Sequence, residues 1–172
     1  MEKFKPSKNY LDNINMYKQM HNEGYGKKDG GFINKEKSFN GMSTIPYAPI
    51  IKKIIHKNNL KNLLDYGCGK GEFYDNDFKL DNIDYPSFRE LWGIDIDLYD
   101  PCYEKYNILN QNKKYDIVIC IDVLEHIPEE DISSVLNLIS NLSNKYILLN
   151  VACYSAQALL PNGENAHINI QE

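Results

Sequence analysis

A chain of 172 residues, 42% hydrophobic and 25% charged, has the size and composition of one globular domain. Its formal net charge of −5 is unlike the basic faces of proteins that grip nucleic acid through phosphates, so we expect no nucleic-acid partner. No apolar run approaches the roughly 20 residues of a membrane span, and the polar amino terminus lacks a signal-peptide core, so we expect a cytoplasmic protein without a membrane partner.

The first 42 residues differ in character from the rest. Residues 1–42 are polar and interrupted by glycines, and within them residues 9–22 form either a short helix or part of a flexible arm. We expect this segment to be an N-terminal arm or lid, and residues 43–172 to form the main domain. A helix is predicted over residues 46–58, because four isoleucines recur there on one helical face.

Short apolar segments then alternate with helical ones. We expect strands at residues 62–66, within residues 91–99, and at residues 106–109, 115–121 and 145–152. The last two are apolar throughout, which is typical of parallel strands covered on both faces. Residues 72–90 are polar, with at most a short helix, and a further helix begins at Pro128. This order predicts an α/β fold, a Rossmann-like and mostly parallel sheet with flanking helices.

A glycine-rich turn follows the first strand, in the sequence Asp65-Tyr-Gly-Cys-Gly-Lys-Gly71. Glycines there let the backbone turn sharply and approach a ligand without a Cβ in the way. The spacing differs from the G-x-G-x-x-G of dinucleotide sites, and Lys70 is followed by glycine rather than by the Ser or Thr of a P-loop.

Two further segments carry candidate chemistry. Acidic residues end the second strand, and a carboxylate there can accept both hydroxyls of a ribose. The fourth strand runs into Asp122-Val-Leu-Glu-His126, which places Asp122 at the carboxyl end of the sheet. His126 is a candidate proton-transfer residue because of its usual pKa, although a histidine there also serves as a packing or capping group.

These motifs resemble those of the class I S-adenosylmethionine-dependent methyltransferases. LLDYGCGKG is similar to motif I, and YDIVICIDVLEH is similar to motif IV. The resemblance implies S-adenosylmethionine as cofactor, S-adenosylhomocysteine as product, and the following cofactor-binding positions: Asp65, Tyr66, Gly67, Cys68, Gly69, Asp122 and Val123. The acid that binds the ribose is either Asp95 or Asp100. Asp95 matches the common sequence pattern of the family, and Asp100 matches a variant pattern in which proline follows the acid. Asp100 leaves a strand of normal length before it.

Two outlying segments resemble a narrower group of bacterial and phage-type members. Residues 17–24 look like a lid segment, and residues 151–167 look like the segment after the fifth strand, which borders the acceptor side. The resemblance implies that Tyr17, His21 and His167 lie on the acceptor side of the site. The alternative is that they are polar side chains in surface loops with no role in the site. Because the four histidines show no HxxxH or HxH spacing, we expect no metal site.

The resemblance predicts a methyltransferase with an unidentified acceptor, which we expect to be a small molecule. A non-catalytic protein that binds S-adenosylmethionine or S-adenosylhomocysteine is the main alternative. A Rossmann enzyme that uses a nicotinamide cofactor fits the glycine spacing less well.

The sequence departs from the family pattern in two places. Only 15 residues separate Asp100 from Asp116, which is short for a helix, a strand and a loop. The chain also leaves no room for the two terminal antiparallel strands, so the strand at residues 145–152 would be an exposed edge. We therefore expect residues 153–172 to fold over that edge, a second copy to cover it in a homodimer, or the chain to be a fragment.

Overall fold

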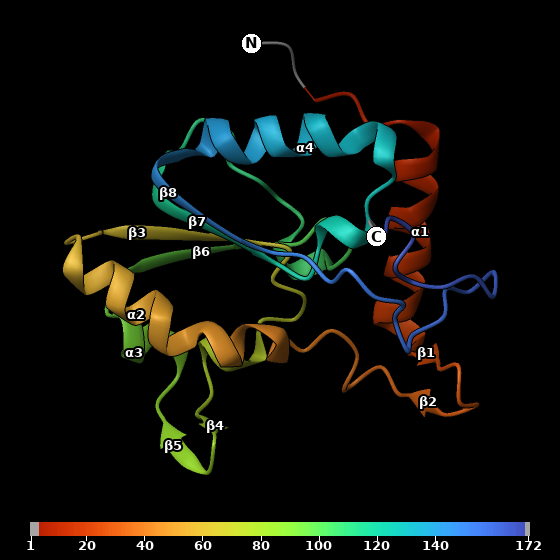
Figure 1. The fold of residues 1–172 in the computed structure, drawn as a ribbon, viewed down its shortest axis with the longest axis horizontal. Coiled ribbons are helices and arrows are strands. Elements are labelled where there is room, and N and C mark those ends of the chain that lie inside the picture. Colours follow the sequence, from red (N-terminus) through yellow and green to blue (C-terminus); the bar gives the residue numbers. More distant parts are fainter. Residues whose placement is uncertain (1–3, 171–172) are drawn as a thin grey trace.

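A parallel sheet with helices on both faces forms the centre of the computed structural model, which describes residues 4–170 (Figure 1). Its strands lie in the order β6-β3-β7-β8, and each neighbouring pair is parallel. Their bounds are β3 (Asn62–Tyr66), β6 (Asp95–Tyr99), β7 (Tyr115–Ile121) and β8 (Ser143–Asn150). The α/β Rossmann-like architecture predicted from the sequence is confirmed.

The two faces of the sheet bury separate apolar clusters. The covering helices are α2 (Ala48–Lys57), α3 (Phe88–Trp92) and α4 (Glu129–Leu142). Leu63 and Ile117 point to α2 and α3, whereas their chain neighbours Leu64 and Val118 point to α4. All four side chains are at most 1% exposed, so the unbroken apolar runs in β3 and β7 reflect burial on both sides.

The helices begin close to where the sequence predicts. A 3₁₀ helix at Met42–Tyr47 leads into α2, so the predicted start at residue 46 lies in this tighter turn. Pro128 directly precedes α4, and Glu129, Glu130 and Asp131 fill its first turn. Negative charge there is favourable next to the exposed amides of the helix start.

The expected strand at residues 106–109 is absent, and that prediction is wrong. A single 3₁₀ turn at Glu104–Tyr106 is followed by loop, in which Ile108 is 87% exposed. Parallel strands need a crossover connection of about a dozen residues or more. The short link between β6 and β7 is used up by this connection and has no residues left for another strand.

A small hairpin lies in the segment that the sequence left irregular. Strands β4 (Phe78–Leu80) and β5 (Ile83–Tyr85) pair antiparallel, and α3 follows. Their turn residues, Asp81 and Asn82, both adopt positive φ, of 50° and 63°. A two-residue hairpin turn of type I′ requires positive φ at both positions, and Asp and Asn tolerate it.

The N-terminal segment is ordered against the sheet. Helix α1 (Lys8–Glu23) is capped by the side chain of Ser7 and lies across the carboxyl ends of the strands (Figure 1). Strands β1 (Tyr25–Gly26) and β2 (Phe32–Ile33) form a short hairpin after it. The helical alternative for this segment is confirmed.

The segment after β8 does not cover the sheet edge, so the expected fold-back is wrong for the residues described. It runs to α1 and β1 instead, where Lys28 donates to the carbonyl of Gln157 and Leu159 to that of Gly26. Its small apolar side chains bury against Tyr17 and Met20 of α1; they are Ala156, Leu160 and Ala166. Within residues 4–170, no other strand pairs with the outer edge of β8.

Candidate functional site

The glycine-rich loop after β3 forms the floor of a cavity at the carboxyl end of the sheet. The amides of Gly67 and Cys68 both donate to the carbonyl of Tyr99, which fastens the loop to β6. Gly67 has φ 91°, and a Cβ there would lie 2.2 Å from Cγ2 of Val123. A Cβ on Gly69, at φ 59°, would lie 2.2 Å from the carbonyl oxygen of Phe39. These glycines are therefore required by the packing of the loop itself.

The structure places the two candidate ribose acids at opposite ends of β6. Asp100 follows β6 directly and lines the cavity, and its carboxylate accepts from the amides of Gly69 (2.9 Å) and Cys102 (2.8 Å). Burial raises the pKa of Asp100, while these amides act to lower it. Asp95 begins β6 at the opposite end of the strand and is exposed, so the fold does not bring it to the cavity.

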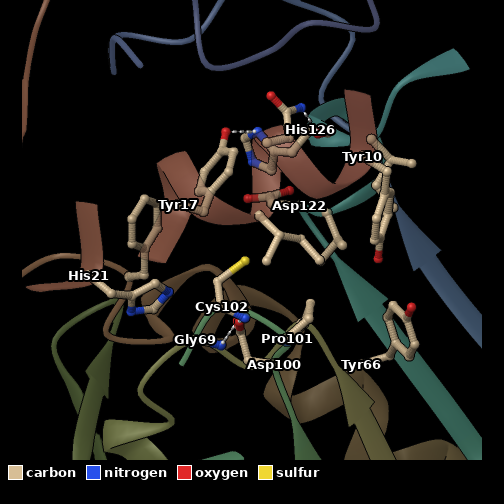
Figure 2. A pocket seen from close by; sticks show the side chains of 16 residues that line it. Tyr10, Tyr17, His21, Tyr66, Gly69, Asp100, Pro101, Cys102, Asp122 and His126 are labelled. Atoms are coloured by element: carbon tan, nitrogen blue, oxygen red, sulfur yellow. Dashed lines mark hydrogen bonds between the residues drawn. The ribbon is translucent and has the colours of Figure 1, made fainter. Parts of the chain in front are cut away.

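The end of β7 supplies the opposite wall. Asp122 and Val123 line the cavity, and Asp122 has φ 53°, in the left-handed region that L residues rarely adopt. Such backbone strain is concentrated at functional sites. The amide of Asp122 donates to the carbonyl of Asn150, which holds the turn in place. The strained turn aims the Asp122 side chain at the cavity (Figure 2).

His126 lies at the centre of a buried hydrogen-bond network. Its Nδ1 is 2.7 Å from the hydroxyl of Tyr17 and 2.9 Å from the carbonyl oxygen of Ala166. Its own carbonyl accepts from the side chain of Asn13 on α1. Burial lowers the pKa of His126 to about 4, so the ring is neutral at physiological pH. A catalytic role for His126 remains a prediction.

Aromatic side chains close the cavity from above. We call this group the aromatic roof; it consists of Tyr10, Tyr17, His21 and Phe39 (Figure 2 labels the first three). His21 stacks on Tyr103, and burial lowers the pKa of His21 to about 4. The cavity is partly open to solvent and has a volume of about 120 Å³, below the roughly 300–1,000 Å³ of most small-ligand sites. We therefore expect a nucleoside-sized ligand to displace the roof.

Most of the site residues predicted from the sequence meet at this cavity. Those lining it are Tyr17, His21, Tyr66, Gly67, Gly69, Asp100, Asp122, Val123 and His126. Asp65 and Cys68 are buried behind the loop rather than in the cavity, and Asp65 accepts a hydrogen bond from Tyr74 at 2.7 Å. His167 also lies outside the lining, with its ring 4.9 Å from that of His126.

Other lining residues were missed by the sequence reasoning. They are Tyr10, Asn13, Ile14, Phe39, Pro101, Cys102 and Ile127. Pro101 and Cys102 directly follow Asp100, which is a predicted cofactor-binding residue. Their position in the sequence therefore indicates that they line the same cavity. The sulfur of Cys102 points into the middle of the cavity (Figure 2). Tyr10 and Phe39 belong to no motif, and only the docking of α1 and its following loop brings them here.

The fold and the site together define a class of protein. A glycine-rich loop after the first strand of a parallel sheet, with an acid at the end of the neighbouring strand, is the arrangement of Rossmann-like nucleotide-binding domains. The sequence matches the family described as "Methyltransferase domain" over residues 45–170. The chain belongs to this family, and the predicted membership in the class I S-adenosylmethionine-dependent methyltransferases is confirmed.

One curated relative supports the same assignment. The chain is 24% identical over 143 residues to the magnesium-protoporphyrin O-methyltransferase of Synechocystis sp., a match that covers 74% of this chain. The chain spans 60% of that relative's length. No solved structure matches the chain. None of the helices within residues 4–170 combines the length and apolar character needed to cross a membrane.

Proposed function

We propose that the chain binds S-adenosylmethionine in the cavity under the aromatic roof and transfers its methyl group to a small-molecule acceptor. The observation that carries this proposal is the pairing of Asp100 with the amide of Gly69 at the carboxyl end of the sheet. β3 lies between β6 and β7, so the chain crosses over in opposite directions from it. Ligands of open α/β sheets bind at such a switch point.

The residues of the cavity have distinct roles in this proposal. Asp100 holds the two ribose hydroxyls, because each of its carboxylate oxygens has a lone pair left after accepting one backbone amide. The glycine loop and the Asp122 turn surround the amino-acid half of the cofactor. When bound, the sulfonium supplies an electrophilic methyl group and departs as the neutral thioether S-adenosylhomocysteine. The protein then chiefly orients the two reactants and excludes water.

A small acceptor fits the character of the site. Tyr17, His21 and His126 present polar atoms on apolar rings at one side of the cavity, which is typical of small-molecule sites. The net charge of −5 does not favour an acceptor rich in phosphate. A carboxylate or hydroxyl nucleophile would enter from the side of Tyr17 and His126, opposite the glycine loop.

Calorimetric titration with S-adenosylmethionine and S-adenosylhomocysteine tests the cofactor site. We expect Asp100→Asn to weaken binding about 10- to 100-fold, because hydrogen bonds to a charged group contribute about 1.5–3 kcal/mol. Asp95→Asn is the matched control, because it removes an acid from the same strand at the exposed end. It should bind like the wild type.

Three results would count against the proposal. A folded chain that binds neither ligand would contradict the cofactor site. Tight binding without transfer of an isotope-labelled methyl group to any acceptor in a broad screen would favour the non-catalytic alternative. Equal loss of affinity in the Asp95 and Asp100 variants would mean that charge alone, and not a contact with ribose, controls binding.

A further inference from the structure

We propose that Glu125, His126 and His167 form a binding site for one divalent transition-metal ion beside the cavity. Each residue offers one ligand atom, and these atoms lie within 4.8 Å of one another. Glu125 and His126 are adjacent at the end of the turn after β7, and His167 comes from the segment that packs on α1. The inference does not depend on the proposed cofactor.

Glu125 gives the strongest indication of a missing partner. Its side chain is fully buried, at 0% exposure, and one carboxylate oxygen, Oε1, accepts from the amide of Ala152 at 2.9 Å. The other oxygen, Oε2, is buried and has no hydrogen-bond partner among the described residues. A buried carboxylate oxygen without a partner is costly, and an ion is one of the groups that would satisfy it.

Backbone carbonyls favour the tautomer with a free Nε2 in both histidines. Tyr17 donates its hydroxyl hydrogen to the carbonyl of Ala166, so the contacts of His126 Nδ1 with that hydroxyl (2.7 Å) and that carbonyl (2.9 Å) are hydrogen bonds when Nδ1 carries a hydrogen. His167 Nδ1 faces the carbonyl of Tyr154 in the same way. In this tautomer each ring keeps its lone pair on Nε2. Metal-binding histidines commonly donate their other N–H to a backbone carbonyl, which fixes the ring.

The chain on either side of His167 is fastened to the other two ligands. The carbonyl oxygen of Ala166, just before it, lies 2.9 Å from Nδ1 of His126. Just after it, the amides of Ile168 and Asn169 both donate to the carbonyl of Glu125, at 3.0 Å. The side chain of Asn165 bridges the amide and the carbonyl of Ala156 and also accepts from the amide of His167. The fold therefore places His167 against Glu125 through several independent contacts.

The ligand set indicates the kind of ion. Two neutral imidazoles and one carboxylate suit zinc, manganese, iron, cobalt or nickel, whereas magnesium prefers oxygen ligands alone. Ligand atoms about 2.1 Å from a tetrahedral metal lie roughly 3.4 Å apart, so the cluster has to contract on binding. His126 also lines the cavity, so the ion would border the proposed acceptor side.

Metal titration of the tag-free chain, stripped with EDTA, tests the site. Equilibrium dialysis with Zn²⁺, Mn²⁺ and Co²⁺ gives the stoichiometry, and the visible spectrum of Co²⁺ reports its ligands. We expect one ion per chain. Glu125→Gln and His167→Ala should each weaken binding at least about 100-fold, because loss of an outer-shell partner alone costs 10–100-fold. His56→Ala, which removes an exposed potential ligand on α2, should bind like the wild type.

The outcomes separate clearly. A bound ion should raise the melting temperature of the wild type and of His56→Ala, but not that of His167→Ala. Because Glu125 is buried, its variant could lose its fold; His167→Ala changes a half-buried side chain and then decides the question. A wild type that binds less than one ion per chain, or binding that survives in His167→Ala, would overturn the site. Neither result bears on cofactor binding, which is measured separately.

Discussion

Asp65 lies behind the glycine loop, where its carboxylate is 2% exposed and accepts from the hydroxyl of Tyr74. Burial raises the pKa of Asp65 from 3.8 to about 7, the hydrogen bond from Tyr74 acts to lower it, and the nearby carboxylate of Asp100 raises it further. The folded chain therefore binds a proton at this residue over a pH range in which the unfolded chain has released it. Below pH 3.8, Asp65 is protonated in both states and does not lower the free energy of unfolding. This free energy decreases as the pH rises from 3.8 towards 7.

We expect Asp65→Asn to be more stable than the wild type at neutral pH, because asparagine carries no charge to bury. The pKa shift corresponds to at most about 4 kcal/mol, and we expect a gain of about 1–3 kcal/mol near pH 8 that shrinks towards pH 5. Urea unfolding across this range measures it. Asp95→Asn, at an exposed position, should show no such trend. Parallel pH profiles for wild type and Asp65→Asn would contradict the buried-charge argument.

At the scale of elements, β8 is the least protected part of the sheet. It pairs with β7 on one side, and Tyr146, Ile147 and Leu149 are 40–43% exposed. An apolar strand with a free edge promotes pairing with another strand. The segment after β8 leaves this edge open because its apolar residues are buried against α1 instead. We therefore propose that a second copy of the chain covers β8 in a homodimer.

Light scattering coupled to size exclusion tests this pairing. We expect a dimer that becomes a monomer in Ile147→Lys, because a charge on an edge strand opposes pairing. Ile108→Lys is the control, since Ile108 is 87% exposed but lies in the loop between β6 and β7. Amides of residues 143–150 should exchange slowly in the wild type. A monomer in which these amides exchange rapidly would contradict the proposal.

At the scale of the whole molecule, local patterns predicted the sheet but not what closes the site. The apolar runs of β3 and β7 and the glycine loop have short-range causes, so residues such as Gly67 and Asp122 were found from sequence. Strand length in the sequence favoured Asp100 over Asp95, and the strand register then places Asp100 at the cavity and Asp95 at the opposite end of β6. The cluster of His126 and His167 unites residues 41 positions apart, which no spacing rule detects. Long-range packing decides such features.

The aromatic roof depends on this long-range packing and makes the cavity small. Phe39 contacts the rings of Tyr17, His21 and Tyr25, with centroids 4.7–5.6 Å apart. It therefore joins α1 to the hairpin beyond it and holds the roof together. If the cofactor binds at this cavity, it binds to an open form in which these contacts are broken. The apparent affinity and the association rate then depend on how often the open form is populated.

We expect the observed rate of S-adenosylhomocysteine binding, followed by stopped flow, to level off at high ligand concentration, because opening of the roof becomes limiting. Phe39→Ala should raise the plateau several-fold by removing the ring that joins α1 to the hairpin. Phe32→Ala is the control, because Phe32 lies in β2 and is 64% exposed, away from the cavity. A rate that rises linearly with concentration, and equally in all three proteins, would show that the roof does not limit access. Faster binding in both variants would instead assign the effect to general loosening of the N-terminal segment.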